Sequence, residues 1–414
     1  MGKLKLISNG IIKNIILLAT GSIMAQAITL VSSPILTRIY GPSELGVLGN
    51  YMAIINVIMP ISALCFPLAI VLTKSEDEAK EVASTASIVS LLLSFLSATV
   101  IVFIKDIYVL PFNSFYLFFI PVVIIFSTQL QISQQLLIKD EKFRVISKLS
   151  VVHSFIINLM KIVGGLFYNT AITLILVSSL SPGVNFLLLR RFSNNKGTHN
   201  IYCFKKIFIR YYDFAFYRTP QVLLNGISNS IPIFMLTYYF GAKYAGFYAI
   251  ANSVLTIPTL LVSKSVSDVF YPKFSKLINS SPREAVKLFN IATLSLIPVA
   301  AVPLIIFGLF SPELFNFVFG SGWSVSGEYA QVIALASFVA LVSRPAITAI
   351  APLKLQKSFL IFEIASVILR VLIFYIVVNE SGKHLEAVLS FSIVNAMVYF
   401  LISLMVYMNV RKKI

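Results

Sequence analysis

The sequence has 414 residues, of which 58% are hydrophobic and 12% charged, and its formal net charge is +17. Soluble domains typically have about 45–50% apolar and about 25% charged residues, so this composition excludes an ordinary soluble enzyme and favours a chain that sits in lipid. The basic excess would also suit a nucleic-acid partner, and its placement along the chain decides between the two. Cys65 lies in an apolar run and Cys203 in a basic one, which predicts no disulfide framework.

Apolar segments recur along the whole chain, and each has the length of about 20 residues that a helix needs to cross a hydrocarbon core of about 30 Å. They lack the alternation of a transmembrane barrel, so we predict an all-α integral membrane protein. Lysines ahead of the first segment and the triplet Ala25-Gln26-Ala27 could also indicate a cleaved signal peptide, but the apolar run continues to Leu36 and favours an uncleaved span. We expect about twelve transmembrane helices, at approximately 15–37, 45–72, 83–104, 115–138, 147–167, 170–189, 217–240, 244–270, 287–310, 328–351, 358–378 and 387–408.

Lysine and arginine are concentrated in alternate loops. The loops on the side of the termini have most of them, whereas the opposite loops have only Arg38, Lys105, Lys243 and Lys383. By the positive-inside rule, both termini are expected in the cytoplasm. Because the charge is spread over many membrane-edge loops, contact with anionic membrane lipids explains it better than nucleic acid does. The basic groups on the terminal side are Lys3, Lys5, Lys13, Lys74, Lys80, Lys139, Lys142, Arg144, Lys148, those from Arg190 to Arg218 and from Lys264 to Lys287, Lys354, Lys357, Arg411, Lys412 and Lys413.

A long polar interruption divides the predicted spans into two halves. Tyr40–Gly46 and Phe240–Gly246 share one glycine spacing, and each lies between the first and second spans of its half. Two six-helix halves with a site between them are a common plan of membrane transporters. The predicted parts are an N-terminal six-helix bundle (1–190), a basic cytoplasmic linker (191–213) and a C-terminal six-helix bundle (214–414).

Motifs for chemistry are missing from the sequence. It contains no G-x-x-x-x-G-K-[ST] phosphate loop, so direct ATP coupling is not expected. His153, His199 and His384 are far apart, and no cysteine or histidine spacing fits a metal site. The outer loops are short, with scattered acidic residues and no paired carboxylates. We therefore predict no catalytic residue, no metal and no cofactor.

The informative ionisable residues inside the predicted spans are Lys161, Arg344, Glu363 and Arg370. A charge at mid-membrane costs about 2.5–3.5 kcal/mol on insertion scales, so such groups pair with one another, snorkel to the interface or face a polar cavity. Lys161 and Arg370 lie near the midplane and favour a cavity, whereas Glu363 lies roughly 9 Å deep, where snorkelling also remains open. Because cations predominate, Lys161, Arg344 and Arg370 are candidates for binding an anion such as a diphosphate or an acidic sugar, and Glu363 is a candidate for ion coupling.

Several segments together carry a family resemblance. They include Tyr217-Arg218-Thr219-Pro220-Gln221, Val269-Phe270-Tyr271-Pro272-Lys273, the N-terminal Ser33-Pro34-Ile35-Leu36-Thr37-Arg38-Ile39-Tyr40-Gly41-Pro42, and Val318-Phe319-Gly320. With these motifs the chain resembles the oligosaccharide flippases of bacterial O-antigen and capsule synthesis, within the multidrug/oligosaccharidyl-lipid/polysaccharide exporter superfamily. The motifs are mostly structural, so they identify the family better than the sugar.

The resemblance implies a MATE-like, two-bundle transporter in the bacterial inner membrane. The implied cargo is an undecaprenyl-diphosphate-linked oligosaccharide, which the protein carries from the cytoplasmic to the periplasmic leaflet by alternating access. The resemblance also implies coupling to H⁺ or Na⁺ and association with polysaccharide polymerase machinery. None of the matching motifs assigns a residue of this sequence to ion coupling. Two alternatives stay open. A multidrug exporter of the same fold is disfavoured by the basic cavity groups, and a membrane polymerase or glycosyltransferase would need an outer catalytic loop.

Overall fold

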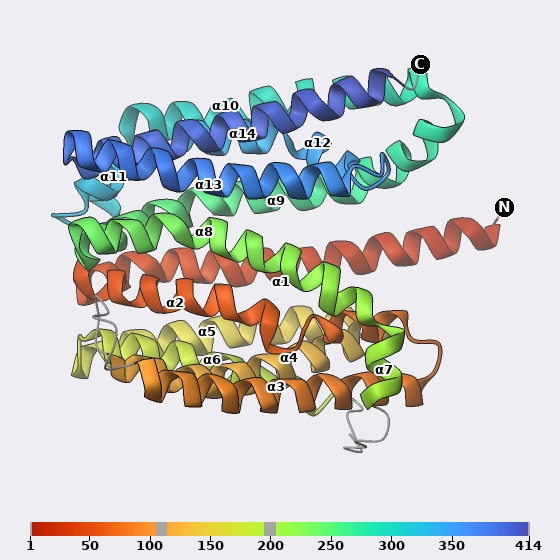
Figure 1. Cartoon of the computed structure of the whole chain (residues 1–414), viewed down its shortest axis with the longest axis horizontal. Helices are drawn as coiled ribbons and strands as arrows, with labels where there is room; N and C mark the ends of the chain where they lie inside the picture. The colour runs from red at the N-terminus through yellow and green to blue at the C-terminus, as the bar shows by residue number, and fades with distance from the viewer. Residues whose placement is uncertain (1, 105–113, 194–203, 413–414) are drawn as a thin grey trace. The chain divides into compact units, whose positions relative to one another are not determined.

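The computed structural model describes residues 2–104, 114–193 and 204–412, and all the regular secondary structure within them is helical. Ten helices in this part of the chain are long and apolar enough to cross a membrane (Figure 1). The predicted all-α membrane fold is therefore confirmed. His199, Cys203, Lys105 and Lys413 lie outside the described residues.

Residue contacts divide the chain into unit 1, Met1–Ser230, and unit 2, Ile231–Ile414. The boundary between the two units falls inside helix α8 (Thr219–Phe240), which begins shortly after the predicted linker (191–213). The predicted limits of the two bundles stay a prediction. Unit 1 contains α1 (Gly2–Ile39), α2 (Pro42–Ser62), the 3₁₀ helix η1 (Phe66–Leu72), α3 (Glu76–Ile104), the 3₁₀ helix η2 (Ser114–Phe119), α4 (Ile120–Lys139), α5 (Phe143–Phe167), α6 (Ala171–Arg190), α7 (Phe204–Arg210) and the π-helical turn η4 (Phe214–Arg218). Helix α8 (Thr219–Phe240) begins in unit 1 and ends in unit 2.

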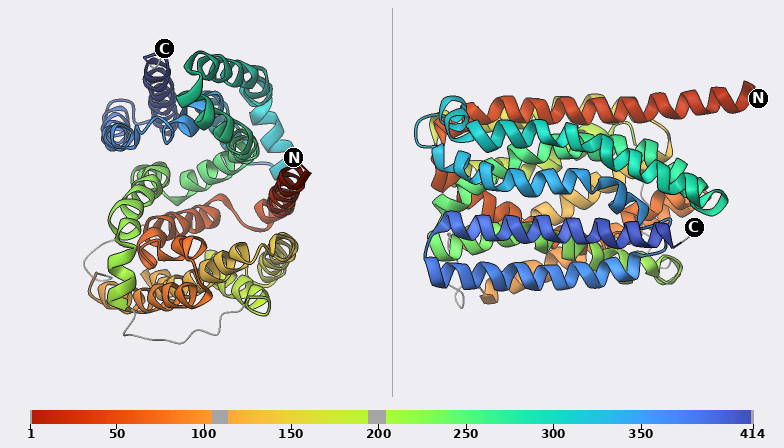
Figure 2. Two further views of the ribbon diagram at one scale, coloured as in Figure 1. Left: turned by 90° about the vertical axis from the view of Figure 1, so that its right-hand side faces the viewer. Right: turned by 90° about the horizontal axis from the view of Figure 1, so that it is seen from above.

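Unit 2 continues with six further helices. The long ones among them run roughly parallel (Figure 2). Helix α11 packs against α9, α10 and α14, and α13 packs against α14. Phe274, Phe374 and Val406 are among its fully buried side chains. The six are α9 (Ala242–Ser280), α10 (Pro282–Phe319), α11 (Ser324–Val342), α12 (Arg344–Ala349), α13 (Gln356–Ser381) and α14 (His384–Arg411).

Two of the predicted spans are broken. The segment 45–72 divides into α2 and η1, because Leu64 and Cys65 have positive φ angles of 48° and 55° that no α-helix tolerates. The segment 328–351 divides into α11 and α12 at Ser343, just before the Arg344-Pro345 pair. Both breaks lie next to prolines, which cannot donate the helical hydrogen bond.

Other predicted boundaries also change. The seventh and eighth predicted spans are the helices α8 and α9, and α8 is not among the ten apolar helices of the described chain. Helix α8 contains Asn225, Ser228 and Asn229, which lower its apolar content. The segment between the predicted spans 244–270 and 287–310, expected as a loop, is helical except around Ser281, because α9 and α10 extend beyond those spans.

The outer faces of the long helices are apolar. Phe95 in unit 1 is 76% exposed and Phe317 in unit 2 is 83% exposed. Small polar side chains instead lie inside, where Ser90, Thr128 and Ser311 are fully buried. This is the arrangement expected when lipid is the surrounding solvent and helix contacts are made by small residues.

The repeated glycine motif lies at the start of a helix in both halves of the chain. Gly41 precedes α2 and Gly241 precedes α9, each as the residue that caps the helix. Gly241 has a φ of 94°, a conformation that a side chain disfavours. The weak sequence repeat therefore corresponds to a repeated helix–turn–helix unit.

Gly327 sets the close approach of α10 and α11. A Cβ atom there would overlap the backbone of Ser311 and Pro312, and the Ser311 hydroxyl donates a hydrogen bond of 2.7 Å to the Gly327 carbonyl. We expect Gly327→Ala to lower the free energy of unfolding by about 1–3 kcal/mol through overpacking. Thermal unfolding in detergent checks this, with Gly308→Ala in α10 as the control because nothing lies within 4 Å of its Cβ position. Equal melting temperatures for the two variants would contradict this account of the packing.

Candidate functional site

Lys161 lies on α5 in unit 1 and is half-buried. Helices α1 and α5 pack along a polar seam here, since the Tyr40 hydroxyl donates to the Lys161 carbonyl at 2.9 Å and the Ser154 hydroxyl donates to the Ala25 carbonyl at 2.7 Å. Asn158 adds a hydrogen bond of 3.2 Å to Thr29. Among the described residues no carboxylate forms an ion pair with the Lys161 ammonium group. These hydrogen bonds hold the backbone of α5 at Lys161 against α1, and none of them is made to the ammonium group itself.

Arg370 lies at the centre of a polar cluster in unit 2. It is 7% exposed, and its guanidinium group donates to the Asn395 side-chain oxygen at 2.9 Å. The guanidinium carbon lies 5.9 Å from the centre of the Phe391 ring. Tyr248 from α9 and Tyr399 from α14 interact with its charge. Asn395 and Phe391 of α14 therefore contact this cation directly, as the buried position of a charge within an apolar helix requires.

Glu363 belongs to the same cluster. It lies two turns before Arg370 on α13, is half-buried, and interacts electrostatically with Arg370. A carboxylate and a guanidinium on one helix face, with tyrosines nearby, can exchange partners when an ion or an anion arrives. The two sequence candidates on α13 are thus brought into one electrostatic cluster.

Arg344 begins the short helix α12 in unit 2. Its Nε atom is buried without a hydrogen-bond partner in the described residues. The hydroxyl of the preceding Ser343 donates to the Tyr399 carbonyl at 3.2 Å, so the start of α12 lies against α14. Tyr399 is also one of the residues near Arg370. Arg344, Glu363 and Arg370 therefore share unit 2, whereas Lys161 belongs to unit 1.

A cavity of about 360 Å³ lies within unit 1, with a mostly apolar lining that includes a few polar groups, and the sequence did not predict it. Asn56, Gln131 and Arg218 supply its polar groups, and the apolar part of the lining comes mainly from α2 and η1. The Arg218 guanidinium donates to Gln221 at 2.9 Å. A cation, two amides and an apolar wall suit a phosphate or sugar head group joined to a lipid. The full lining is Asn56, Met59, Pro60, Ala63, Cys65, Leu68, Gln131, Arg218 and Val222.

Two local irregularities form this cavity. The break between α2 and η1 turns Cys65 and Leu68 toward it. On the other side, the π-helical turn η4 ends at Arg218, and the amide of Thr219 donates to the Phe214 carbonyl five residues earlier. Pro220 lacks an amide hydrogen and so favours such widening of the helix. The motif Tyr217–Gln221 is one of those that carry the family resemblance, and its Pro220 is the sequence signal that could have indicated a site.

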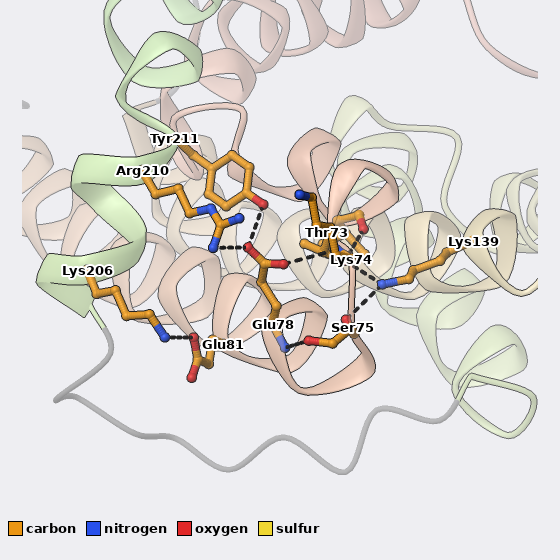
Figure 3. Close-up of polar contacts among 10 residues, drawn as sticks. Thr73, Lys74, Ser75, Glu78, Glu81, Lys139, Lys206, Arg210 and Tyr211 are labelled. Atoms are coloured by element: carbon orange, nitrogen blue, oxygen red, sulfur yellow. Dashed lines mark hydrogen bonds and ion pairs between the residues drawn. The ribbon is translucent and has the colours of Figure 1, made fainter.

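Helix α7 lies in the predicted linker and is tied to the start of α3 (Figure 3). The Arg210 guanidinium forms an ion pair of 2.8 Å with Glu78, and the Lys206 ammonium one of 3.1 Å with Glu81. The Tyr211 hydroxyl also donates to Glu78 at 3.0 Å, and burial together with this carboxylate raises the pKa of Tyr211. Part of the linker is therefore a fixed helix of unit 1.

Lys139 connects the end of α4 to the same region (Figure 3). Its ammonium group donates to the Thr73 hydroxyl and, at 3.0 Å, to the Ser75 carbonyl. Ser75 in turn accepts from the amide of Glu78 at 3.2 Å and so caps α3. Lys139, Lys206 and Arg210, three of the basic groups on the predicted cytoplasmic side, thus have specific structural partners.

Residues 35–328 match the model of a protein family described as "Polysaccharide biosynthesis protein". Two curated relatives match over shorter segments. The "Teichuronic acid biosynthesis protein TuaB" of Bacillus subtilis (strain 168) is 23% identical over 137 residues, which are 33% of this chain and 28% of that protein. An "Uncharacterized membrane protein in cps region" of Klebsiella pneumoniae is 26% identical over 133 residues, which are 32% of this chain and 27% of that protein. The matched segments thus span less than a third of either relative.

Solved structures share the fold over nearly the whole chain. The lipid II flippase MurJ in an inward closed conformation has a TM-score of 0.74 at 14% identity, covering 94% of this chain and 87% of MurJ. An inward-facing multidrug resistance MATE family transporter of the MOP superfamily has a TM-score of 0.68 at 15% identity, covering 94% of this chain and 95% of its own. At these identities the likeness establishes the fold, and the expected MATE-like architecture is confirmed.

Proposed function

Because the chain belongs to the polysaccharide biosynthesis protein family and is a multi-pass membrane protein, we propose that it is a flippase for a lipid-linked oligosaccharide. The observation that carries the proposal is the family match over 35–328 on a fold similar to that of a lipid II flippase. The cargo has a charged head group that cannot cross the hydrocarbon core unaided. A protein of this kind supplies a polar path and leaves the lipid tail in the bilayer.

The proposed cargo is an undecaprenyl-diphosphate-linked repeat unit of an O-antigen or a capsule. In this proposal, Lys161, Arg344 and Arg370 face the diphosphate or an acidic sugar during transport. The unit 1 cavity with Arg218, Asn56 and Gln131 offers a further polar surface for the head group. Guanidinium groups suit such a ligand because their fork of donors matches phosphate oxygens.

The proposed setting is the inner membrane of a bacterium with both termini in the cytoplasm. The charge asymmetry of the loops supports this orientation. Alternating access would carry the head group to the periplasmic leaflet, driven by an H⁺ or Na⁺ gradient that acts through Glu363. The product then meets polysaccharide polymerase machinery on that side. No bond of the cargo is broken, so the protein acts as a transporter and not as an enzyme.

A multidrug exporter is the second candidate, since MATE transporters share the fold. Cationic drugs require acidic groups where they bind. Among the described residues, Arg218 is the charged side chain that lines the unit 1 cavity, and Arg370 is a buried charge of unit 2. These basic groups favour an anionic cargo over a cationic drug.

Depletion of the protein in its own host tests the proposal. We expect lipid-linked repeat units to accumulate with their head groups in the cytoplasmic leaflet, while surface polysaccharide declines. Membrane vesicles of known orientation, treated with a sugar oxidant that does not permeate, would measure the leaflet. Normal surface polysaccharide together with unchanged leaflet distribution would reject the proposed function.

A further inference from the structure

An aromatic cluster surrounds His384 at the end of unit 2 away from the C-terminus (Figure 1). The Tyr244 ring lies 4.4 Å from the imidazole, centre to centre, with the planes inclined by 36°. Phe240 approaches at 6.0 Å and Tyr329 at 5.6 Å. The end of α8 and the starts of α9, α11 and α14 thus meet at one half-buried imidazole. None of the candidate residues above belongs to this cluster.

One hydrogen bond makes the cluster sensitive to the charge of the ring. The Tyr329 hydroxyl and His384 Nδ1 are 3.0 Å apart, and Tyr329 is fully buried. The neutral ring with its hydrogen on Nε2 accepts the tyrosine hydrogen at Nδ1, whereas in the imidazolium ion both nitrogens donate. Protonation therefore reverses the bond, and the hydroxyl hydrogen of Tyr329 must find another acceptor in a buried place, at a cost.

The other titratable groups near the ring either interact with the imidazole or have partners of their own. On α11, Glu328 is half-buried and interacts with the charge of His384, and on α9 the Tyr244 face can accommodate a cation. On α14 itself, Glu386 is engaged by Lys383 at 2.8 Å. Phe240 on α8 contributes no charge. The imidazolium ion thus has partners of its own, different from those of the neutral ring.

We infer that His384 is a proton-binding site, and that its protonation loosens the contact between the ends of α8, α9, α11 and α14. Histidine is the side chain whose ordinary titration falls within the physiological pH range. The proton comes from the aqueous phase at this end of unit 2 and binds a ring nitrogen, and the Tyr329 hydroxyl then turns away. The inference stands independently of which cargo the protein carries.

The chain has one tryptophan, and it lies in the same cluster. Trp323 is 3% exposed and packs edge-on against Phe247 at 5.6 Å, and Phe247 packs against Tyr244 at 6.1 Å. Tryptophan emission therefore reports the packing around His384 without background from other tryptophans.

The experiment uses the full chain in lipid nanodiscs with His153→Gln and His199→Gln, which leaves His384 as its single histidine. We expect one reversible change of tryptophan emission between about pH 8 and about pH 5. Adding His384→Gln should make the emission constant over this range. A single-histidine protein with constant emission would overturn the inference, and so would a transition that persists after His384→Gln. If His384→Gln does not fold, the single-histidine protein decides the matter alone, because it retains the native cluster.

Discussion

Arg370→Ala is expected to lower the rate of head-group transfer by about 10- to 100-fold, because a charge-assisted hydrogen bond contributes about 1.5–3 kcal/mol. The guanidinium group is buried on α13, bonded to Asn395 and held beside Phe391. Its removal deletes the cation proposed to meet the anionic cargo and leaves the Asn395 oxygen without this donor. The measurement is transfer of a labelled lipid-linked oligosaccharide in vesicles that contain equal amounts of folded protein.

Two further variants separate charge from geometry. Arg370→Lys keeps the positive charge but loses the planar fork, so we expect a rate between those of the unaltered protein and Arg370→Ala. Lys357→Ala removes an exposed cation from the same helix and should leave transfer unchanged. Full transfer activity in Arg370→Ala would remove Arg370 from the proposed binding residues.

Glu363→Gln is expected to abolish the dependence of transport on an ion gradient. Glu363 is half-buried on α13 and interacts with Arg370, so protonation or cation binding at the carboxylate changes the charge that Arg370 presents to the cargo. The amide of glutamine has a similar shape but can neither ionise nor bind a proton in this range. Transfer measured with and without a pH or sodium gradient should become the same.

The matched control lies at the other end of α13. Glu380 is exposed, and Glu380→Gln should keep the full gradient stimulation of the unaltered protein. If Glu363→Gln responds to the gradient as strongly as Glu380→Gln does, coupling does not act through Glu363. A comparison of pH and sodium gradients in the unaltered protein identifies the coupling ion.

Much of the fold follows from apolar length and charge placement. Each long apolar run became helical, because in lipid a helix satisfies its own backbone hydrogen bonds. Arg370 and Glu363 were recognised as candidates because a charge within a span needs a partner, and the structure shows such a partner for Arg370 in Asn395 on α14. The helix breaks were less visible, since Pro60 lies within α2 and the chain leaves the helix only at Leu64 and Cys65.

The unit 1 cavity could not be predicted from periodicity. Asn56, Gln131 and Arg218 lie on three segments far apart in the sequence, and each is unremarkable on its own helix. Helix α7 was not predicted from the sequence for a related reason. It is short, and it is held by ion pairs to Glu78 and Glu81, about 125 residues away. Contacts between distant segments carry no signature in local composition.

The central claim is that this protein moves a lipid-linked oligosaccharide between leaflets, and reconstitution of the purified chain into vesicles tests it. A non-permeant enzyme that cleaves exposed sugar head groups measures how fast a head group labelled on the inner leaflet reaches the outer one. We predict transfer well above that of protein-free vesicles, reduced in Arg370→Ala and unaffected in Lys357→Ala. Transfer equal to that of empty vesicles, with export of a cationic dye by the same preparation, would contradict the account.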